Sequence, residues 1–386
     1  MTNNLTKRVL NIAPSATLAI DSKAKQLKKD GKDMVIFGAG EPDFNTPDNI
    51  KRAAIKAVEN NITRYTPVAG IPELKKAVSD KFRKFNKINY DTSEILISCG
   101  GKHSLYNICM AVLEKGDEAI LPVPYWVSYD EMIKLCDAKT VFCNTDEKFK
   151  LTAKDVEEKI TKHTKLLFLN SPSNPSGAVV EPSEIRKIAK LAVDHNFYVI
   201  SDEVYEYLIY GKEHLSIASI NDEIKNLTIT ANSVSKTYAM TGWRIGYLGA
   251  NRELVNAMTN LQGHSTSNAS NIAQMAAIEA LNGPQDSVAK MVKAFDERRK
   301  FMWKRLNEMG LECVEPEGAF YAFPSIKSTK LDSTKFCSKL LDEALVAVVP
   351  GNAFGSDDFV RLSYATSMQE IEKGMDRIEK WLKTIN

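Results

Sequence analysis

The strongest constraint on the fold is an alternation of apolar strands and helices that begins near residue 94. Strand-like runs recur at residues 95–98, 118–121, 140–143, 166–170, 198–201 and 243–250, with helical patterns between several of them, for instance at 102–114 and 182–195. Strands that alternate with helices pack as a mostly parallel sheet wound with helices. We therefore predict an α/β fold whose ligands bind at the carboxyl ends of the strands.

One later stretch, residues 232–246, combines groups that suit a phosphate with a single lysine. It follows an apolar run at 226–231 that predicts a buried strand, and it contains Ser233, Ser235, Lys236 and Arg244. Hydroxyls and a planar guanidinium satisfy phosphate oxygens, and a desolvated lysine has a lowered pKa and can form a Schiff base. Taken alone, the stretch fits a surface lysine in a loop equally well.

A second stretch favours the chemical interpretation. Residues 197–205 predict a strand whose carboxyl end carries Asp202 and Tyr205. Asp202 precedes Lys236 by 34 residues (236 − 202), which is enough for a strand–crossover–strand path that brings both to one sheet edge. An aspartate and a lysine at neighbouring strand ends suit pyridoxal phosphate, because the lysine holds the aldehyde and the carboxylate keeps the pyridine nitrogen protonated.

With these stretches the chain resembles the fold-type I, class I aminotransferases, and within them the bacterial-type aspartate aminotransferases. The resemblance runs from Pro14-Ser15-Ala16-Thr17 to Arg361-Leu362-Ser363-Tyr364-Ala365-Thr366. Between them stand Gly40-Glu41-Pro42-Asp43-Phe44, Tyr65-Thr66-Pro67-Val68-Ala69-Gly70, Gly100-Gly101-Lys102, Pro124-Tyr125-Trp126-Val127-Ser128-Tyr129, Asn170-Ser171-Pro172-Ser173-Asn174-Pro175-Ser176-Gly177 and the lysine stretch. The resemblance implies a seven-stranded, mostly parallel sheet with a smaller α+β domain, pyridoxal 5'-phosphate as cofactor, and a homodimer with shared active sites.

The resemblance also implies roles for cofactor-binding residues. Lys236 would be the Schiff-base lysine and the acid–base, and Asp202 would pair with the pyridinium nitrogen. Tyr205 and Asn174 would donate hydrogen bonds to the phenolic oxygen of the ring, and Trp126 would stack on its face. The phosphate would be surrounded by Gly100, Gly101, Lys102, Ser233, Ser235 and Arg244, and Tyr65 would reach the phosphate of the neighbouring subunit.

Substrate groups follow from the same resemblance. Arg361 would bind the α-carboxylate by two parallel hydrogen bonds, with Gly40 as a backbone contact and Trp126 and Asn174 beside it. The best-known relatives use an arginine of the partner subunit for a distal carboxylate, but the corresponding stretch, residues 262–268, contains none. The bacterial-type branch uses a lysine and a threonine, which Lys102 and Thr17 match.

Several of these residues also have simpler local interpretations. Asp202 fits a helix cap after its strand, Asn174 before a proline fits a turn, and Gly40 fits an ordinary turn. Trp126 fits a core position. Arg361 fits a buried structural ion pair.

The remaining features concern organisation. We expect residues 1–46 to form an N-terminal arm and part of the small domain, residues 47–283 the large cofactor-binding domain, and residues 284–386 the small C-terminal α+β domain. A long charged helix over 283–308 is expected to carry Arg298 and Arg299 on outward positions.

Composition excludes some classes of function. The net charge of +2 gives no electrostatic case for nucleic acid or membrane as a partner. The six cysteines show no C-x-x-C pair, which favours free thiols in a reducing compartment, five of them buried, and no metal site is expected. No signal-like or membrane-length apolar run stands out, so we expect a cytoplasmic protein.

Together these features predict a pyridoxal-phosphate-dependent aminotransferase, aspartate:2-oxoglutarate, which works through two half-reactions. The same chemistry with aromatic amino acids, alanine or prephenate stays open, and so does a carbon–sulfur lyase of this fold. A cofactor-sensing transcription regulator is not expected, because Gly40 stands too close to the start of the chain for a DNA-binding domain to precede it.

Overall fold

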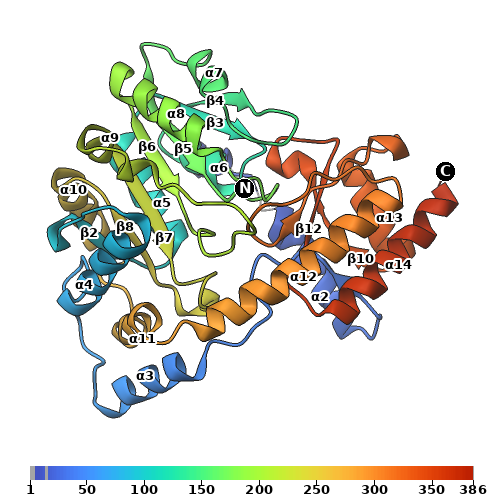
Figure 1. Cartoon of the computed structure of the whole chain (residues 1–386), viewed down its shortest axis with the longest axis horizontal. Helices are drawn as coiled ribbons and strands as arrows, with labels where there is room; N and C mark the ends of the chain where they lie inside the picture. Colours follow the sequence, from blue (N-terminus) through green and yellow to red (C-terminus); the bar gives the residue numbers. More distant parts are fainter. Residues whose placement is uncertain (1–4, 14–15, 386) are drawn as a thin grey trace.

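The computed structural model describes residues 5–13 and 16–385, and its main element is a seven-stranded sheet. The strands are β2 (Ile95–Ser98), β3 (Glu118–Val123), β4 (Lys139–Asn144), β5 (Thr164–Asn170), β6 (Tyr198–Asp202), β7 (Thr228–Ser233) and β8 (Gly246–Gly249). Their order is β2-β8-β7-β6-β5-β3-β4, and β8 runs antiparallel to both of its neighbours (Figure 1). The predicted α/β fold with a mostly parallel seven-stranded sheet is confirmed.

Helices cover both faces of this sheet, which is why its strands are apolar almost throughout. One face packs against α5 (Gly101–Val112), α6 (Ser128–Leu135) and α10 (Arg252–Gly263). The other face packs against α7 (Ala153–Glu157), α8 (Pro182–His195) and α9 (Asp222–Leu227), and near β2 and β8 against α3 (Asp48–Glu59), α4 (Pro72–Lys81) and α11 (Asn271–Asn282). Neighbouring residues alternate between the faces: Ile200 packs with the first set and Val199 with the second.

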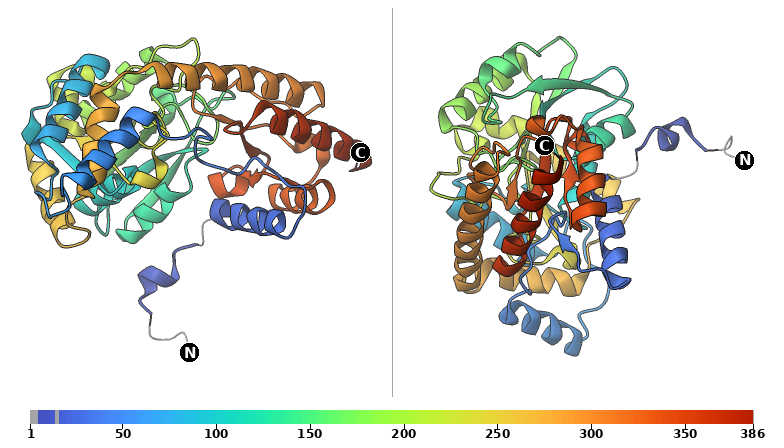
Figure 2. Two further views of the ribbon diagram at one scale, coloured as in Figure 1. Left: turned by 90° about the horizontal axis from the view of Figure 1, so that it is seen from below. Right: turned by 90° about the vertical axis from the view of Figure 1, so that its right-hand side faces the viewer.

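The C-terminal quarter of the chain and an N-terminal segment form a second body with its own apolar core. Its helices are α2 (Ala16–Lys29), α12 (Asp286–Glu308), α13 (Ser333–Ala344) and α14 (Met368–Ile385), and its strands are β1 (Val35–Ile36), β9 (Tyr321–Ala322), β10 (Val346–Ala347), β11 (Val349–Pro350) and β12 (Val360–Ser363). β1 pairs in parallel with β10, and β12 lies between β11 and β9. Figure 2 shows α2 against this body. The division at residues 46 and 283 stays a prediction.

The first described element, α1 (Lys7–Leu10), lies at the periphery of the molecule in Figure 2, against α6. Arg8 pairs with Asp137 at 2.9 Å, and the backbone N–H of Ala13 donates to Glu131 at 3.1 Å. The apolar side chains of Val9 and Leu10 are exposed. This segment therefore follows the outer side of α6 without burying its own apolar residues.

Three local details differ from the sequence expectations. The strand expected at 243–250 starts only at Gly246, because Thr241–Trp243 forms a 3₁₀ turn, and residues 226–227 end α9 instead of starting β7. Arg299 is buried, not outward: its guanidinium pairs with Asp296 at 2.8 Å and Glu315 at 2.6 Å. Acidic partners at both sides compensate the burial of its charge, and helical spacing alone does not reveal them.

All six cysteines are unpaired, and five are buried, as expected. In the part of the chain that the structure describes, every helix is too short or too polar to cross a membrane.

Candidate active site

A cavity of about 480 Å³ lies at the carboxyl ends of β5, β6 and β7, a volume typical of sites for small molecules. It is the place that the topology predicts, since β6 and β7 are parallel neighbours and Asp202 is in register with Ala231. Twelve of the predicted site residues line it: Gly40, Gly101, Lys102, Trp126, Asn174, Asp202, Tyr205, Ser233, Ser235, Lys236, Arg244 and Arg361.

Lys236 is half-buried in this cavity, just after the end of β7. Its ammonium donates a hydrogen bond to the backbone carbonyl of Gly40. Burial lowers the pKa of the Lys236 amine to about 8, and the nearby guanidinium groups of Arg361 and Arg244 act in the same direction. A useful fraction of this amine is therefore neutral close to neutral pH, which a nucleophile or a proton acceptor requires. The interpretation as a surface lysine does not fit this environment.

Asp202 ends β6, the strand beside β7, and lines the same cavity. Its carboxylate accepts hydrogen bonds from the Tyr129 hydroxyl at 2.6 Å and from the backbone N–H of Val204 at 3.2 Å. Burial raises the pKa of the Asp202 carboxyl to about 6, and the hydrogen bond from Tyr129 opposes that rise. The Asp202 carboxylate can therefore hold a cationic nitrogen, and that positive charge would lower the pKa of the Asp202 carboxyl again.

Tyr129 was not singled out from the sequence, although it closes the quoted motif that contains Trp126. The two side chains are in contact, with ring centroids 5.3 Å apart in an edge-to-face arrangement. Trp126 stands two residues before α6 and Tyr129 lies in its first turn, and their place in one motif after β3 was the available signal.

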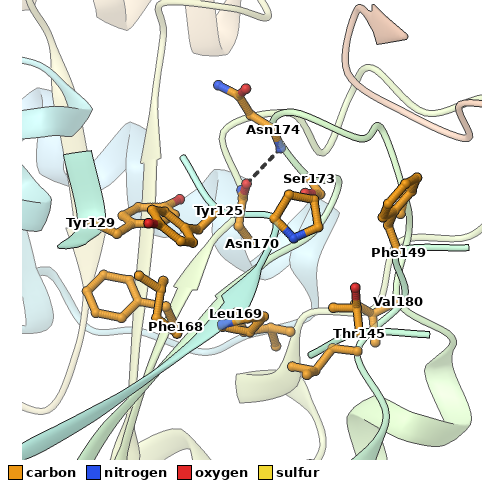
Figure 3. Close-up of a pocket in the computed structure, with 15 residues that line it drawn as sticks. Tyr125, Tyr129, Thr145, Phe149, Phe168, Leu169, Asn170, Ser173, Asn174 and Val180 are labelled. Carbon is orange, nitrogen blue, oxygen red and sulfur yellow. Dashed lines mark hydrogen bonds between the residues drawn. The ribbon is translucent and has the colours of Figure 1, made fainter. Parts of the chain in front are cut away.

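Asn170, at the end of β5, joins the loop that carries Asn174 to the aspartate strand. Its side-chain carbonyl accepts from the backbone N–H of Asn174 at 3.0 Å, as Figure 3 shows, and its amide donates to the backbone carbonyl of Asp202 at 3.0 Å. A separate cavity of about 30 Å³ lies behind this loop, with Tyr129, Asn170 and Asn174 among its lining residues (Figure 3). Asn174 therefore has a fixed backbone position and presents its side chain to the main cavity.

Arg361, on β12, faces the cavity from the second core. Its two terminal nitrogens donate to the side-chain carbonyl of Asn174 and to the backbone carbonyl of Gly38, each at 3.0 Å. The side chain is 2% exposed, and its buried Nε has no hydrogen-bond partner. Among the residues that the structure describes, no carboxylate lies within ion-pair distance of it, so the alternative of a structural ion pair finds no support.

Aromatic rings complete the surroundings of Arg361. Its guanidinium lies 4.4 Å from the ring centroid of Tyr321, and the Tyr321 hydroxyl is 3.0 Å from that of Tyr205. Burial raises the pKa of the Tyr205 hydroxyl well above its usual value, so it remains a proton donor. Tyr321 is a second site residue that the sequence analysis missed, because the short strand β9 carries no motif.

The amino end of α5 and the start of the lysine loop form a corner whose groups could hold an anion. The first N–H groups of a helix have no partner within it and attract anions. Gly101 packs on Ser233, and the backbone N–H of Ser235 donates to the Ser233 hydroxyl at 3.2 Å. Gly100 supports this corner without lining the cavity: its φ is +95°, and a Cβ there would lie 2.4 Å from the Arg244 guanidinium.

Lys102, in the first turn of α5, extends over Trp126. Its ammonium lies 4.9 Å from the centroid of the Trp126 ring. Burial lowers the pKa of Lys102, and the charge of Arg244 adds to that effect. Since Trp126 is half-buried against the cavity, it is not an ordinary core residue.

Some predicted residues are not brought to the cavity. Tyr65 does not line it and is 91% exposed. Thr17 belongs to α2, but its side chain, like residues 14 and 15, lies outside the described residues.

In the stretch 262–268, which contains no arginine, Gln262 still belongs to α10 and is buried. Its amide donates to the backbone carbonyls of Val68 at 2.9 Å and Ile97 at 2.8 Å.

Comparisons with known proteins find relatives over nearly the whole chain. Residues 32–378 match the family described as aminotransferase class I and II. The chain is 46% identical to an aspartate aminotransferase of Bacillus sp. (strain YM-2), over 98% of this chain and 99% of that protein. It is also 46% identical to a probable aspartate/prephenate aminotransferase of Aquifex aeolicus (strain VF5), over the whole of both chains. The solved structure of an aspartate aminotransferase from Thermus thermophilus with maleate superposes with a TM-score of 0.96 at 40% identity, covering 98% of this chain and 100% of that one.

Proposed function

Because the chain belongs to the class I and II aminotransferases, we propose that it moves the amino group between L-aspartate or L-glutamate and a 2-oxo acid, with pyridoxal 5'-phosphate as cofactor. The observation that carries the proposal is that a buried guanidinium and an amine of lowered pKa face the same cavity. Arg361 is buried without an anionic partner among the described residues, and Lys236 has a pKa lowered to about 8. An amino acid needs both: a site for its carboxylate and a neutral amine beside its α-carbon.

The residues of the cavity fit this cofactor group by group. Lys236 would bind its aldehyde, Asp202 its ring nitrogen, and the corner of Gly101, Ser233 and Ser235 its phosphate. Arg244 would add a cation there, Trp126 would cover the ring, and Tyr205 and Asn174 would donate to its phenolic oxygen. When bound, the cofactor supplies an aldehyde that condenses with amines and a ring that accepts an electron pair.

The chain's own residues would do the rest. Arg361 would orient the substrate by two parallel hydrogen bonds to its α-carboxylate, with the Gly40 backbone beside it. Lys236 Nζ would carry the proton between the α-carbon of the substrate and the C4′ carbon of the cofactor, in opposite directions in the two half-reactions, for which a pKa near the working pH is favourable. Tyr205, kept protonated by burial, would remain a hydrogen-bond donor throughout.

Selection for acidic substrates is proposed for Lys102. Its ammonium enters the cavity beside Trp126, where it is partly desolvated and can bind a distal carboxylate more strongly than in water. The similarity to a structure solved with maleate, a dicarboxylate, supports this assignment. Thr17 stays a proposed second contact. Prephenate also carries two carboxylates, and the similarity to a probable aspartate/prephenate enzyme keeps it as a second candidate substrate.

The test is a survey of kcat/KM over aspartate, glutamate, alanine, phenylalanine and prephenate, each with a matching amino donor or acceptor. Formation of the 2-oxo acid must require an acceptor over many turnovers. Release of ammonia and pyruvate without one would instead identify the carbon–sulfur lyase. The Lys236→Ala variant serves as the control and should lose turnover and the borohydride-reducible link to the cofactor. A reducible link to another lysine would contradict the assignment.

A homodimer with shared sites is part of the proposal. Tyr65 projects into solvent at 91% exposure, and Ile55 and Val58 on α3 are likewise exposed, so a second copy would bury apolar surface there. The hypothesis is that Tyr65 completes the phosphate site of the partner. Mixing Tyr65→Ala with Lys236→Ala then creates one intact site in each hybrid dimer and restores activity. No recovery after subunit exchange would show that Tyr65 does not act across the dimer.

The six unpaired cysteines support a reducing compartment, the cytoplasm, as the place of action.

A further inference from the structure

Behind Asp202 lies a set of buried charged and polar residues that the reaction does not use. We call it the buried ionic network: Lys81, Asn86, Glu203, Glu206, His214 and Asn232. Lys81 is 7% exposed, and Glu203 and Glu206 are each 1% exposed. None of the charged members lines the cavity.

The charges of the network are paired. Lys81 forms an ion pair with Glu206, and His214 lies 3.0 Å from Glu203. The Asn86 amide lies within hydrogen-bond distance of both carboxylates, at 2.8 Å from Glu203 and 2.6 Å from Glu206. Glu203, Glu206 and His214 are close enough to hold a metal ion, but these contacts already use the carboxylate oxygens. Because buried ion pairs contribute little net stability, the network calls for a further physical explanation.

Asn232 connects the network to the cavity. The backbone pairing of β6 with β7 ends at Asp202 and Ala231, followed by one hydrogen bond of 3.0 Å from Glu203 N–H to the Ala231 carbonyl. Beyond that point the Asn232 side chain continues the connection. Its amide donates to the Glu203 backbone carbonyl at 3.2 Å and to the Glu206 carboxylate at 2.7 Å, and its oxygen accepts from Ser233 N–H at 2.7 Å.

We propose that Asn232, oriented by Glu206, is a positioning residue that fixes the phosphate-binding serines relative to Asp202. The inference rests on the proposed cofactor. Asp202 and Ser233 would bind the two ends of one rigid molecule, its ring nitrogen and its phosphate. The binding free energies of these two contacts add fully only if the distance between Asp202 and Ser233 is already set before binding. Otherwise part of the binding free energy is used to order the strand ends.

The experiment compares three probes on the protein freed of cofactor: pyridoxal phosphate, pyridoxal and inorganic phosphate. Binding of the first two is followed by titration, and binding of phosphate by protection against thermal unfolding. For Asn232→Ala we expect the affinity for pyridoxal phosphate to fall about tenfold or more. The affinities for pyridoxal and for inorganic phosphate should each fall less than about twofold. A merely structural effect would weaken all three by similar factors, and that result would overturn the inference.

A matched pair of variants decides the matter even if Asn232→Ala does not fold. Lys81→Met/Glu206→Gln and Lys81→Met/Glu206→Leu both remove the ion pair, but only the glutamine keeps an acceptor for the Asn232 amide. The leucine variant should bind pyridoxal phosphate more weakly than the glutamine variant. The two variants should bind pyridoxal with the same affinity as each other, and likewise inorganic phosphate. Equal affinities for pyridoxal phosphate in the pair would contradict the role of Glu206.

The proposed function fails separately from this inference. If the unchanged protein binds pyridoxal phosphate no more tightly than pyridoxal, the cavity has no phosphate site, and the cofactor assignment itself is wrong. If the unchanged protein discriminates strongly and the variants discriminate equally well, the cofactor assignment stands and the positioning role of Asn232 is wrong.

Discussion

Replacing Lys102 with methionine is expected to remove recognition of acidic side chains and to leave the chemistry intact. Methionine keeps an unbranched apolar stem over Trp126, where the Lys102 ammonium lies 4.9 Å from the ring centroid, so the change removes mainly the charge. The ammonium is partly buried and close to Arg244, and the pKa of Lys102 is lowered accordingly. A substrate carboxylate beside the ammonium would offset both the desolvation of Lys102 and its repulsion by Arg244. Lys102 should therefore form a strong ion pair with an acidic substrate.

The magnitude follows from one hydrogen bond between charged groups. Such a bond contributes about 1.5–3 kcal/mol, which is roughly 10- to 150-fold in kcat/KM. We therefore expect Lys102→Met to lower kcat/KM for aspartate and glutamate within that range. Alanine and phenylalanine, which have no distal carboxylate, should change little or improve. Steady-state kinetics with all four donors at one acceptor concentration measures the ratio directly.

Arg361→Lys is the matched comparison, because the α-carboxylate is common to every donor. It should weaken acidic and neutral donors alike, since lysine cannot reproduce two parallel hydrogen bonds. The reasoning on Lys102 would be refuted if Lys102→Met lowered acidic and neutral substrates by the same factor. Lys102 would then be a phosphate-binding or structural residue, and the preference for aspartate would have to come from elsewhere in the cavity.

The remaining predictions concern proton binding. Asp202→Asn should still bind cofactor but lose several kcal/mol of transition-state stabilisation, because a neutral ring accepts electrons poorly; turnover within about tenfold of the unchanged enzyme would show another role. The lowered pKa of Lys236, about 8, means that the folded protein binds fewer protons than the unfolded chain between pH 8 and the usual lysine pKa of 10.5. Stability of the cofactor-free protein relative to Lys236→Met should therefore rise with pH through that window, by about 3 kcal/mol in all. Urea unfolding at several pH values measures the difference, and a flat difference would contradict the burial of the amine.

The sequence by itself determined the sheet and most of the site. Apolar runs separated by helices specify parallel strands; of the chemistry-bearing residues, Asp202 ends one of these strands and Lys236 lies shortly after the end of the next. In a parallel sheet the carboxyl ends must meet at one edge, so their proximity is a consequence of local pattern and chain direction. The motif residues Gly101, Trp126 and Asn174 reach the same cavity for that reason.

Only the tertiary structure decided which of these side chains have partners. Arg361 comes from a different core and meets Asn174 across 187 residues of chain, and no local pattern shows that its guanidinium lacks a carboxylate there. The burial of Arg299, the contact of Tyr129 with Asp202, and the pairing of Lys81 with Glu206 are likewise long-range or depend on helix packing. Secondary structure follows from periodicity along the chain, whereas burial, pKa and hydrogen-bond satisfaction depend on the atoms that folding brings from elsewhere.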